Sequence, residues 1–169
     1  MVRDILKLGD SRLYSSSSKI QPREAAEAAR IGDDLKDTME AFRTRHGFGR
    51  AIAAPQIGEF RRVIYMDAGK PALLVNPVLT FIGEDTMEVW DDCMCFPGLF
   101  VKVRRFAKVQ VQYLDENMQR RSMLLETDLS ELIQHECDHL DGILATMRAV
   151  DARSFSLTKN PVLEQGVCK

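Results

Sequence analysis

Two of the three histidines in this chain lie four positions apart in the stretch QHECDHLDG at residues 134–142. On a helix, residues at i and i+4 point to the same side, so His135 and His139 could bind one metal ion. Glu136 is offset from them by about 100 degrees and can reach a metal-bound water without being a ligand itself. The alternative, a solvated polar helix face, is less favoured because it needs these scarce residue types to meet by accident. The pattern predicts a metal centre with its own general base.

Two histidines leave the coordination shell incomplete, and several residues could supply a third ligand. Cys137 lies between the histidines but points to another face, which favours a core position. His46 is more typical of a surface histidine, and Glu164 lies downstream as third-ligand glutamates do in some zinc peptidases. Cys93 and Cys95 are two residues apart in WDDCMCFPG, and their spacing does not choose between them. Asp138 and Asp141 are candidates to orient an imidazole through its other nitrogen.

The composition limits the class of protein. A chain of 169 residues with 45% hydrophobic residues predicts one domain over residues 1–169. The formal net charge of −2 argues against direct nucleic-acid binding. No apolar run approaches the roughly 18 residues of a membrane span, and the first residues lack the apolar core of a signal peptide. We therefore expect no membrane contact, a cytoplasmic location, and cysteines that act as thiols or metal ligands.

The coarse pattern predicts an α+β fold. Helical spacing of apolar residues predicts a helix over about 23–45, and Asp128 to Gly142 bound a second helix, which carries the histidines. Strand formers and alternation predict strands at 61–67, 72–82, 101–115 and 120–126. Pro77 indicates an edge strand or a bulge. After about residue 145 the pattern weakens. We expect mainly antiparallel strands around a central HExxH-bearing helix.

Three separated stretches together resemble the peptide deformylases. That family shows GxGxAAPQ, EGCLS and QHExDH in this order. The chain has GRAIAAPQIG at 49–58, DDCMCFPG at 91–98 and QHECDHLDG at 134–142. The opening ILKLGDSRL is also similar, so the resemblance extends to about residue 145. It implies hydrolysis of the N-formyl group from N-formylmethionyl peptides or nascent chains, with release of formate. The ribosome would then be a further partner, contacted transiently.

The resemblance also implies a ligand set. Cys93 matches the family's cysteine and would be the third metal ligand with His135 and His139. The family typically uses Fe2+, with Zn2+, Ni2+ or Co2+ as substitutes. One thiolate, two imidazoles and an open water position suit zinc equally well by coordination chemistry.

Three more positions match catalytic residues of the family. Glu136 would be the general base and later the acid. The Gln56 amide and the backbone N–H of Met94 would stabilise the oxyanion of the tetrahedral intermediate. We also expect an apolar pocket for the methionine side chain, formed by Ile52, Met94, Ile133 and Cys137.

The chain departs from the family around these residues. In the second motif Asp91, Asp92, Met94 and Cys95 stand for glutamate, glycine, leucine and serine, giving DDCMC in place of EGCLS. In the first motif Arg50 stands for an apolar residue and Ala51 for glycine. We expect the shorter Asp91 to reach Arg105 or a ligating histidine less well, and Asp92 to be strained if the family's glycine has positive φ. No expected ligand, base or oxyanion donor is lost, so an altered rate or substrate preference is predicted.

Two other functions stay open at this point. The changes at Asp92 and Ala51 motivate a catalytically impaired, deformylase-like metal-binding protein that binds formylated or other amino termini. An HExxH metallopeptidase with Glu164 as its third ligand would instead cut internal peptide bonds.

Overall fold

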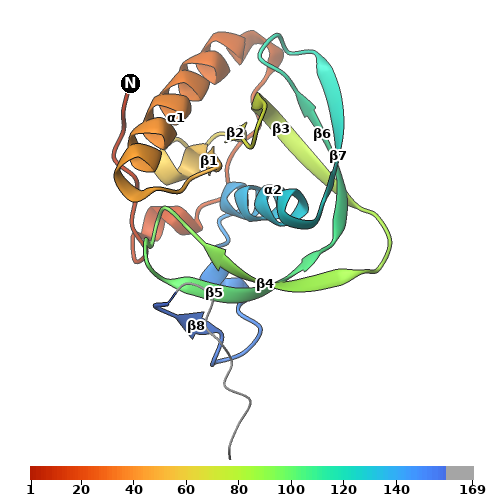
Figure 1. Cartoon of the computed structure of the whole chain (residues 1–169). Helices are drawn as coiled ribbons and strands as arrows, with labels where there is room; N and C mark the ends of the chain where they lie inside the picture. The colour runs from red at the N-terminus through yellow and green to blue at the C-terminus, as the bar shows by residue number, and fades with distance from the viewer. Residues whose placement is uncertain (159–169) are drawn as a thin grey trace, which may run out of the picture.

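In the computed structural model, which describes residues 1–158, antiparallel strands surround one central helix, α2 (Figure 1). One sheet has the order β1-β2-β3-β6-β7 and the other β4-β5-β8, and all pairs are antiparallel. The elements are α1 (Ala25–His46), β1 (Ala51–Ala53), β2 (Val63–Asp67), β3 (Pro71–Phe81), β4 (Thr86–Asp92), β5 (Phe100–Phe106), β6 (Lys108–Leu114), β7 (Arg120–Glu126), α2 (Thr127–Leu140) and β8 (Phe155–Ser156). The α+β prediction is confirmed.

The first predicted helix is α1, preceded by a 3-10 turn at Pro22–Glu24. Its buried apolar side chains recur every three or four residues and pack toward β1 and β2. They include Ile31, Leu35, Met39 and Phe42. The helix ends at Gly47, whose φ of 77° lets its N–H bond to the Arg43 carbonyl.

The predicted strands at 61–67, 72–82 and 120–126 correspond to β2, β3 and β7. The single strand predicted over 101–115 is wrong, because it is two strands, β5 and β6, in different sheets. The chain turns at Ala107, whose N–H donates to Asp85 and whose carbonyl accepts from Thr127. Odd-numbered residues are buried on both sides of this turn, so the alternation does not reveal it. Strand β4 was not predicted.

The indication from Pro77 is confirmed as a bulge. β3 lies between β2 and β6, so it is not an edge strand, and its register shifts between Val75 and Val78. Asn76 has a φ of 53° there, and its side-chain amide exchanges hydrogen bonds of 2.8 and 2.9 Å with the backbone of Ile20.

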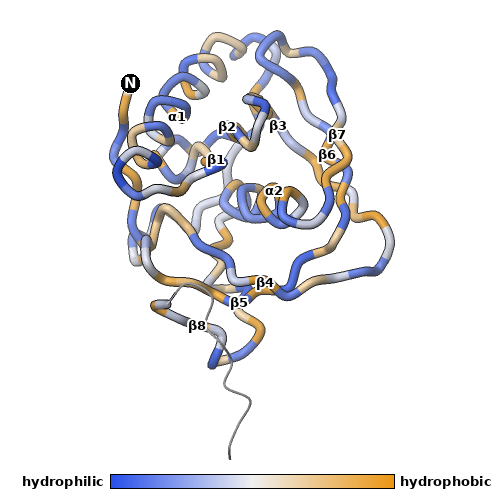
Figure 2. Tube along the Cα trace, in the orientation of Figure 1, coloured by the Kyte–Doolittle hydropathy of each residue, from blue (hydrophilic) through white to orange (hydrophobic). Residues whose placement is uncertain are grey.

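Helix α2 is unusual because its buried residues include a run of polar ones. Residues 132–140 are all buried, among them Gln134, Glu136 and Asp138 besides the two histidines. In Figure 2 the central helix shows hydrophilic segments in the middle of the molecule. Buried polar residues at such density indicate a site rather than simple packing. Within residues 1–158 there is no helix long and apolar enough to cross a membrane.

The turn after α2 gives a testable prediction about stability. Gly142 has a φ of 73°, and a Cβ there would lie 2.5 Å from the Tyr14 carbonyl oxygen. Gly142→Ala should therefore lower the free energy of unfolding through both backbone strain and this clash, by about 1–3 kcal/mol for the strain alone. Gly58→Ala is the control, because Gly58 has a φ of 80° but open space around it. Equal losses for both variants in urea unfolding would contradict the close approach.

Candidate metal centre

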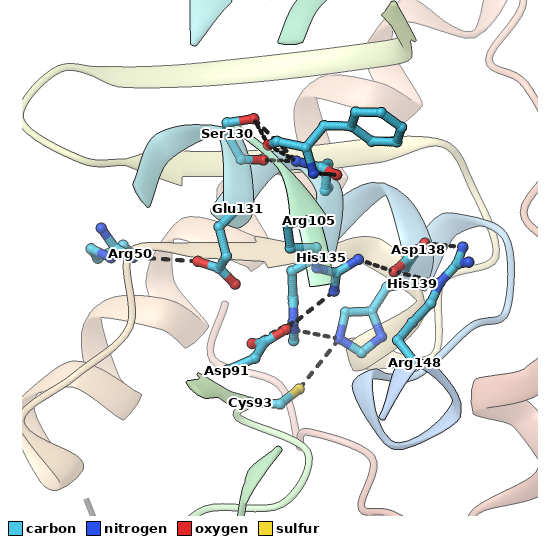
Figure 3. Close-up of polar contacts among 12 residues, drawn as sticks. Arg50, Asp91, Cys93, Arg105, Ser130, Glu131, His135, Asp138, His139 and Arg148 are labelled. Atoms are coloured by element: carbon cyan, nitrogen blue, oxygen red, sulfur yellow. Dashed lines mark hydrogen bonds and ion pairs between the residues drawn. The ribbon is translucent and has the colours of Figure 1, made fainter. Parts of the chain in front are cut away.

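Three potential metal ligands meet between α2 and the end of β4. The Nε2 atoms of His135 and His139 are 3.2 Å apart, and the Sγ of Cys93 lies 3.3 Å from Nε2 of His139. All three side chains are buried, and their donor atoms lie within 4.8 Å of one another (Figure 3). The histidines come from successive turns of α2, and Cys93 directly follows β4.

The other candidates for the third ligand lie elsewhere. Cys137 is buried in the apolar cluster on the opposite side of α2, as expected for a core residue. His46 is exposed and stacks on Phe42, with ring centroids 4.2 Å apart. The Cys95 thiol is close to Gln56 but is not part of the three-donor group. Glu164 lies outside the described residues.

Asp91 fixes the orientation of His135. Its carboxylate lies 2.9 Å from Nδ1 of His135 and 3.1 Å from Nη2 of Arg105 (Figure 3). An Nδ1–H that donates to Asp91 leaves the Nε2 lone pair free to bind a metal. The expectation that the shorter Asp91 would reach these partners less well is wrong, because it contacts both of them.

The predicted roles of Asp138 and Asp141 in orienting an imidazole are also wrong. Asp138 accepts from Arg105 at 2.5 Å and from Arg148 at 2.8 Å, whereas Asp141 pairs with Arg62. On α2, Asp138 faces β5 and the turn at Ala145–Arg148, away from the histidine rings. Asp138 therefore acts on His135 only through Arg105 and Asp91.

The electrostatics of Cys93 and His139 fit a bound cation. Burial raises the pKa of the Cys93 thiol well above its ordinary value, so a thiolate here needs a positive charge beside it. Burial and the neighbouring His135 lower the pKa of His139, which favours the neutral imidazole that binds metals. One thiolate and two imidazoles suit a divalent transition metal.

Glu136 points into the same space, and within residues 1–158 its side chain has no hydrogen-bond partner. Its side chain is buried, and Oε2 makes no hydrogen bond within the described residues. Burial is the main cause that raises the pKa of this carboxyl to about 7. A carboxyl with such a pKa can both accept and return a proton near neutral pH.

Two hydrogen-bond donors lie next to Cys93. The Gln56 Oε1 accepts from the Ala53 N–H at 2.7 Å, so its Nε2 is directed at the Cys93 and Cys95 sulfurs, 3.7 and 3.6 Å away. The backbone N–H of Met94, in the turn after β4, makes no hydrogen bond within residues 1–158. Both donors are available to an oxygen bound beside Cys93.

A cavity of about 360 Å³ opens in front of these groups. The expected apolar pocket is wrong in three of its four residues, because only Met94 lines this cavity, whereas Ile52, Ile133 and Cys137 pack in the core. Charged residues that the prediction left out line it instead, namely Arg50, Asp92 and Glu131. Charged residues at positions 50 and 131 do not predict an apolar pocket, and these two positions become neighbours only in the folded chain.

Asp92 is not strained. It ends β4 in extended conformation and is not among the described non-glycine residues with positive φ. The expected backbone cost of replacing glycine therefore does not arise in this chain.

Comparison with known proteins agrees with this geometry. The family model described as polypeptide deformylase matches residues 2–154. The chain belongs to the peptide deformylase family. It is 36% identical to peptide deformylase 1 of Prochlorococcus marinus, over 93% of this chain and 85% of that one, and 34% identical to peptide deformylase 2 of Ralstonia nicotianae, over 94% and 93%. The peptide deformylase structure from Thermotoga maritima superposes with a TM-score of 0.81 at 26% identity, covering 89% of this chain and 99% of that one.

Peptide deformylases are metal-dependent hydrolases that remove the N-formyl group from nascent peptides, and this is the activity of the chain. The predictions of family, fold and enzyme class are thus confirmed. The deformylase structure from Synechococcus elongatus, in complex with actinonin, is similar as well, with a TM-score of 0.78 and 29% identity over 89% of this chain and 80% of that one.

The position of Asp91 leads to a prediction about metal affinity. Asp91→Asn should weaken metal binding by about 10–100-fold, because a neutral amide replaces the charged carboxylate that fixes the Nδ1–H tautomer of His135. The affinity can be measured by competition with a chromogenic chelator. Asp141→Asn is the matched control and should leave the affinity unchanged, since Asp141 pairs only with Arg62 among the described residues. A similar loss in both variants would contradict the role of Asp91.

Proposed function

We propose that Cys93, His135 and His139 hold one divalent metal ion, Fe2+ in the native protein, with Zn2+, Ni2+ or Co2+ as substitutes. The convergence of one sulfur and two Nε2 atoms in a buried site is the observation that supports this ligand set. When bound, the ion would act as a Lewis acid and lower the pKa of a water molecule bound to it.

The remaining groups then have distinct tasks in hydrolysis of the formyl amide. The Gln56 amide and the Met94 N–H donate to the formyl oxygen as it becomes negative. Glu136 accepts a proton from the attacking water, whose oxygen bonds to the formyl carbon. The carbon–nitrogen bond then breaks, and Glu136 returns the proton to the leaving amine, giving formate and a free amino terminus.

Two further proposals follow from the family and the fold. Residues 1–169 form one metallohydrolase domain that acts in the cytoplasm, where its buried free thiols Cys93, Cys95 and Cys137 stay reduced. Its substrates are N-formylmethionyl nascent chains, met during a transient contact with the ribosome. The part of the tail after residue 158 lies outside the described residues.

The first test is formate release from formyl-Met-Ala-Ser by protein prepared anaerobically with Fe2+. Glu136→Gln should lower kcat by about 10²–10⁴-fold, because it keeps the shape of the side chain but removes the base. Its metal content should equal that of the unaltered chain. Loss of the metal together with the activity would contradict a role limited to proton transfer, and absence of formate with the unaltered, metal-loaded chain would favour the catalytically impaired binding protein.

The deformylase and the alternative HExxH metallopeptidase differ in their third metal ligand, which is Cys93 in the first and Glu164 in the second. Cys93→Ala should abolish stoichiometric metal binding, because only two imidazoles of the donor group remain, whereas Glu164→Ala should leave metal content and formate release unchanged. Metal content is measured for both variants after gel filtration, and formate release is measured for Glu164→Ala. The reverse pattern would favour the HExxH metallopeptidase.

A further inference from the structure

A second thiol lies beside the proposed ligand Cys93, and the mechanism has no use for it. Cys93 and Cys95 are both free and buried, at 3% and 1% exposure, and they belong to the same apolar cluster. Cys95 occupies the position at which the family motif EGCLS has serine. The other free cysteine of the described residues, Cys137, belongs to a different cluster. The thiols of Cys93 and Cys95 therefore form a local pair.

The backbone between the two cysteines brings their side chains together. The Phe96 N–H donates to the Cys93 carbonyl at 3.1 Å, so Cys93 and Cys95 are the first and third residues of a tight turn. The Cys95 N–H points at the Cys93 sulfur, 3.4 Å away, and Gln56 Nε2 lies 3.7 and 3.6 Å from the two sulfurs. A disulfide needs Cα atoms about 4.4–6.8 Å apart, and a tight turn places residues two apart within that range. A bond between the two sulfurs therefore needs no rearrangement of the surrounding strands.

Only one of the two thiols faces the cavity. Cys93 lines the cavity of about 360 Å³ together with Gln56 and Glu136, whereas Cys95 is not among the lining residues. An oxidant small enough to enter the cavity therefore meets Cys93 first. The bound metal of the proposed function keeps Cys93 as the thiolate, which is the nucleophilic form of a cysteine. The Cys95 thiol then lies next to the sulfur that the oxidant modifies.

We propose that Cys93 and Cys95 are a modification site at which a peroxide forms a reversible disulfide, with Cys95 as the resolving thiol. The Cys93 sulfur attacks one oxygen of hydrogen peroxide, the O–O bond breaks, and a sulfenic acid and a water form. The Cys95 sulfur then displaces the remaining oxygen as a second water. Two thiols and one peroxide thus give one disulfide and two waters, and a dithiol reductant restores both thiols by exchange.

The disulfide removes the metal and at the same time protects its ligand. A sulfur in a disulfide is no longer the thiolate that binds a divalent ion, so the ion leaves. Without Cys95, further oxidation converts Cys93 to a sulfinic acid, which thiol reductants do not reverse. Release of the metal rests on the proposed ligand set and function, whereas formation of the disulfide does not.

The test exposes zinc-loaded protein to hydrogen peroxide, because Zn2+ itself has no redox chemistry. In the unaltered chain, the tryptic peptide of residues 63–102 contains both cysteines and should resist alkylation until it is reduced. Zinc should be released at the same time, which a chromogenic chelator measures. Dithiothreitol and fresh zinc should then restore formate release to its starting value. Cys95→Ser should instead carry a sulfinic or sulfonic acid at Cys93 and should not recover after the same treatment.

Cys137→Ala is the matched control and should behave like the unaltered chain, because that thiol lies in a different cluster. Equal irreversible oxidation of Cys93 in the unaltered chain and in Cys95→Ser would overturn the proposal. A disulfide that forms without loss of zinc would support the modification site and contradict the ligand set. A chain that forms the disulfide but releases no formate before oxidation would contradict the proposed function alone.

Discussion

The buried ion pair between Asp91 and Arg105 is the interaction on which the site depends. Both side chains are almost fully buried, at 2% and 4% exposure, and a buried charge without a partner is costly. Arg105 on β5 also pairs with Asp138 on α2, and Asp138 pairs with Arg148, so the network joins the small sheet to the helix and to the turn that follows it. The same Asp91 carboxylate holds His135. The pairing of these charges therefore fixes the position of α2 relative to β4.

This arrangement explains why ligands from distant parts of the chain meet. Cys93 follows Asp91 by two residues, so the strand that orients His135 also delivers the sulfur to the histidine pair. The Gln56 amide nitrogen is directed at the Cys93 sulfur because the N–H of Ala53, at the end of β1, donates to the Gln56 side-chain oxygen. Gln134, His135 and Asp138 of α2 have partners on surrounding elements, while the apolar residues of the same helix pack against the large sheet.

Much of the fold and part of the site could be predicted from the sequence. The spacing in α1 and the HExxH pattern specify their helices, because both depend on residues a few positions apart. Only the family resemblance distinguishes Cys93 from Cys95 as a ligand, because two residues at strand spacing would point to the same side. In the structure both cysteines lie in the turn after β4 and not in a strand. The turn at Ala107 was missed because burial keeps the same period on both sides. Arg50 and Glu131 were missed as cavity residues because they are 81 positions apart and only the placement of β1 beside α2 brings them together.

The central claim is that one thiolate and two imidazoles from Cys93, His135 and His139 form the metal site. X-ray absorption at the metal edge of the zinc-loaded protein tests it most directly. The account predicts one sulfur at about 2.3 Å and two nitrogens at about 2.0–2.1 Å, and the same first shell in Cys95→Ser. A first shell without sulfur, or loss of the sulfur in Cys95→Ser, would contradict it.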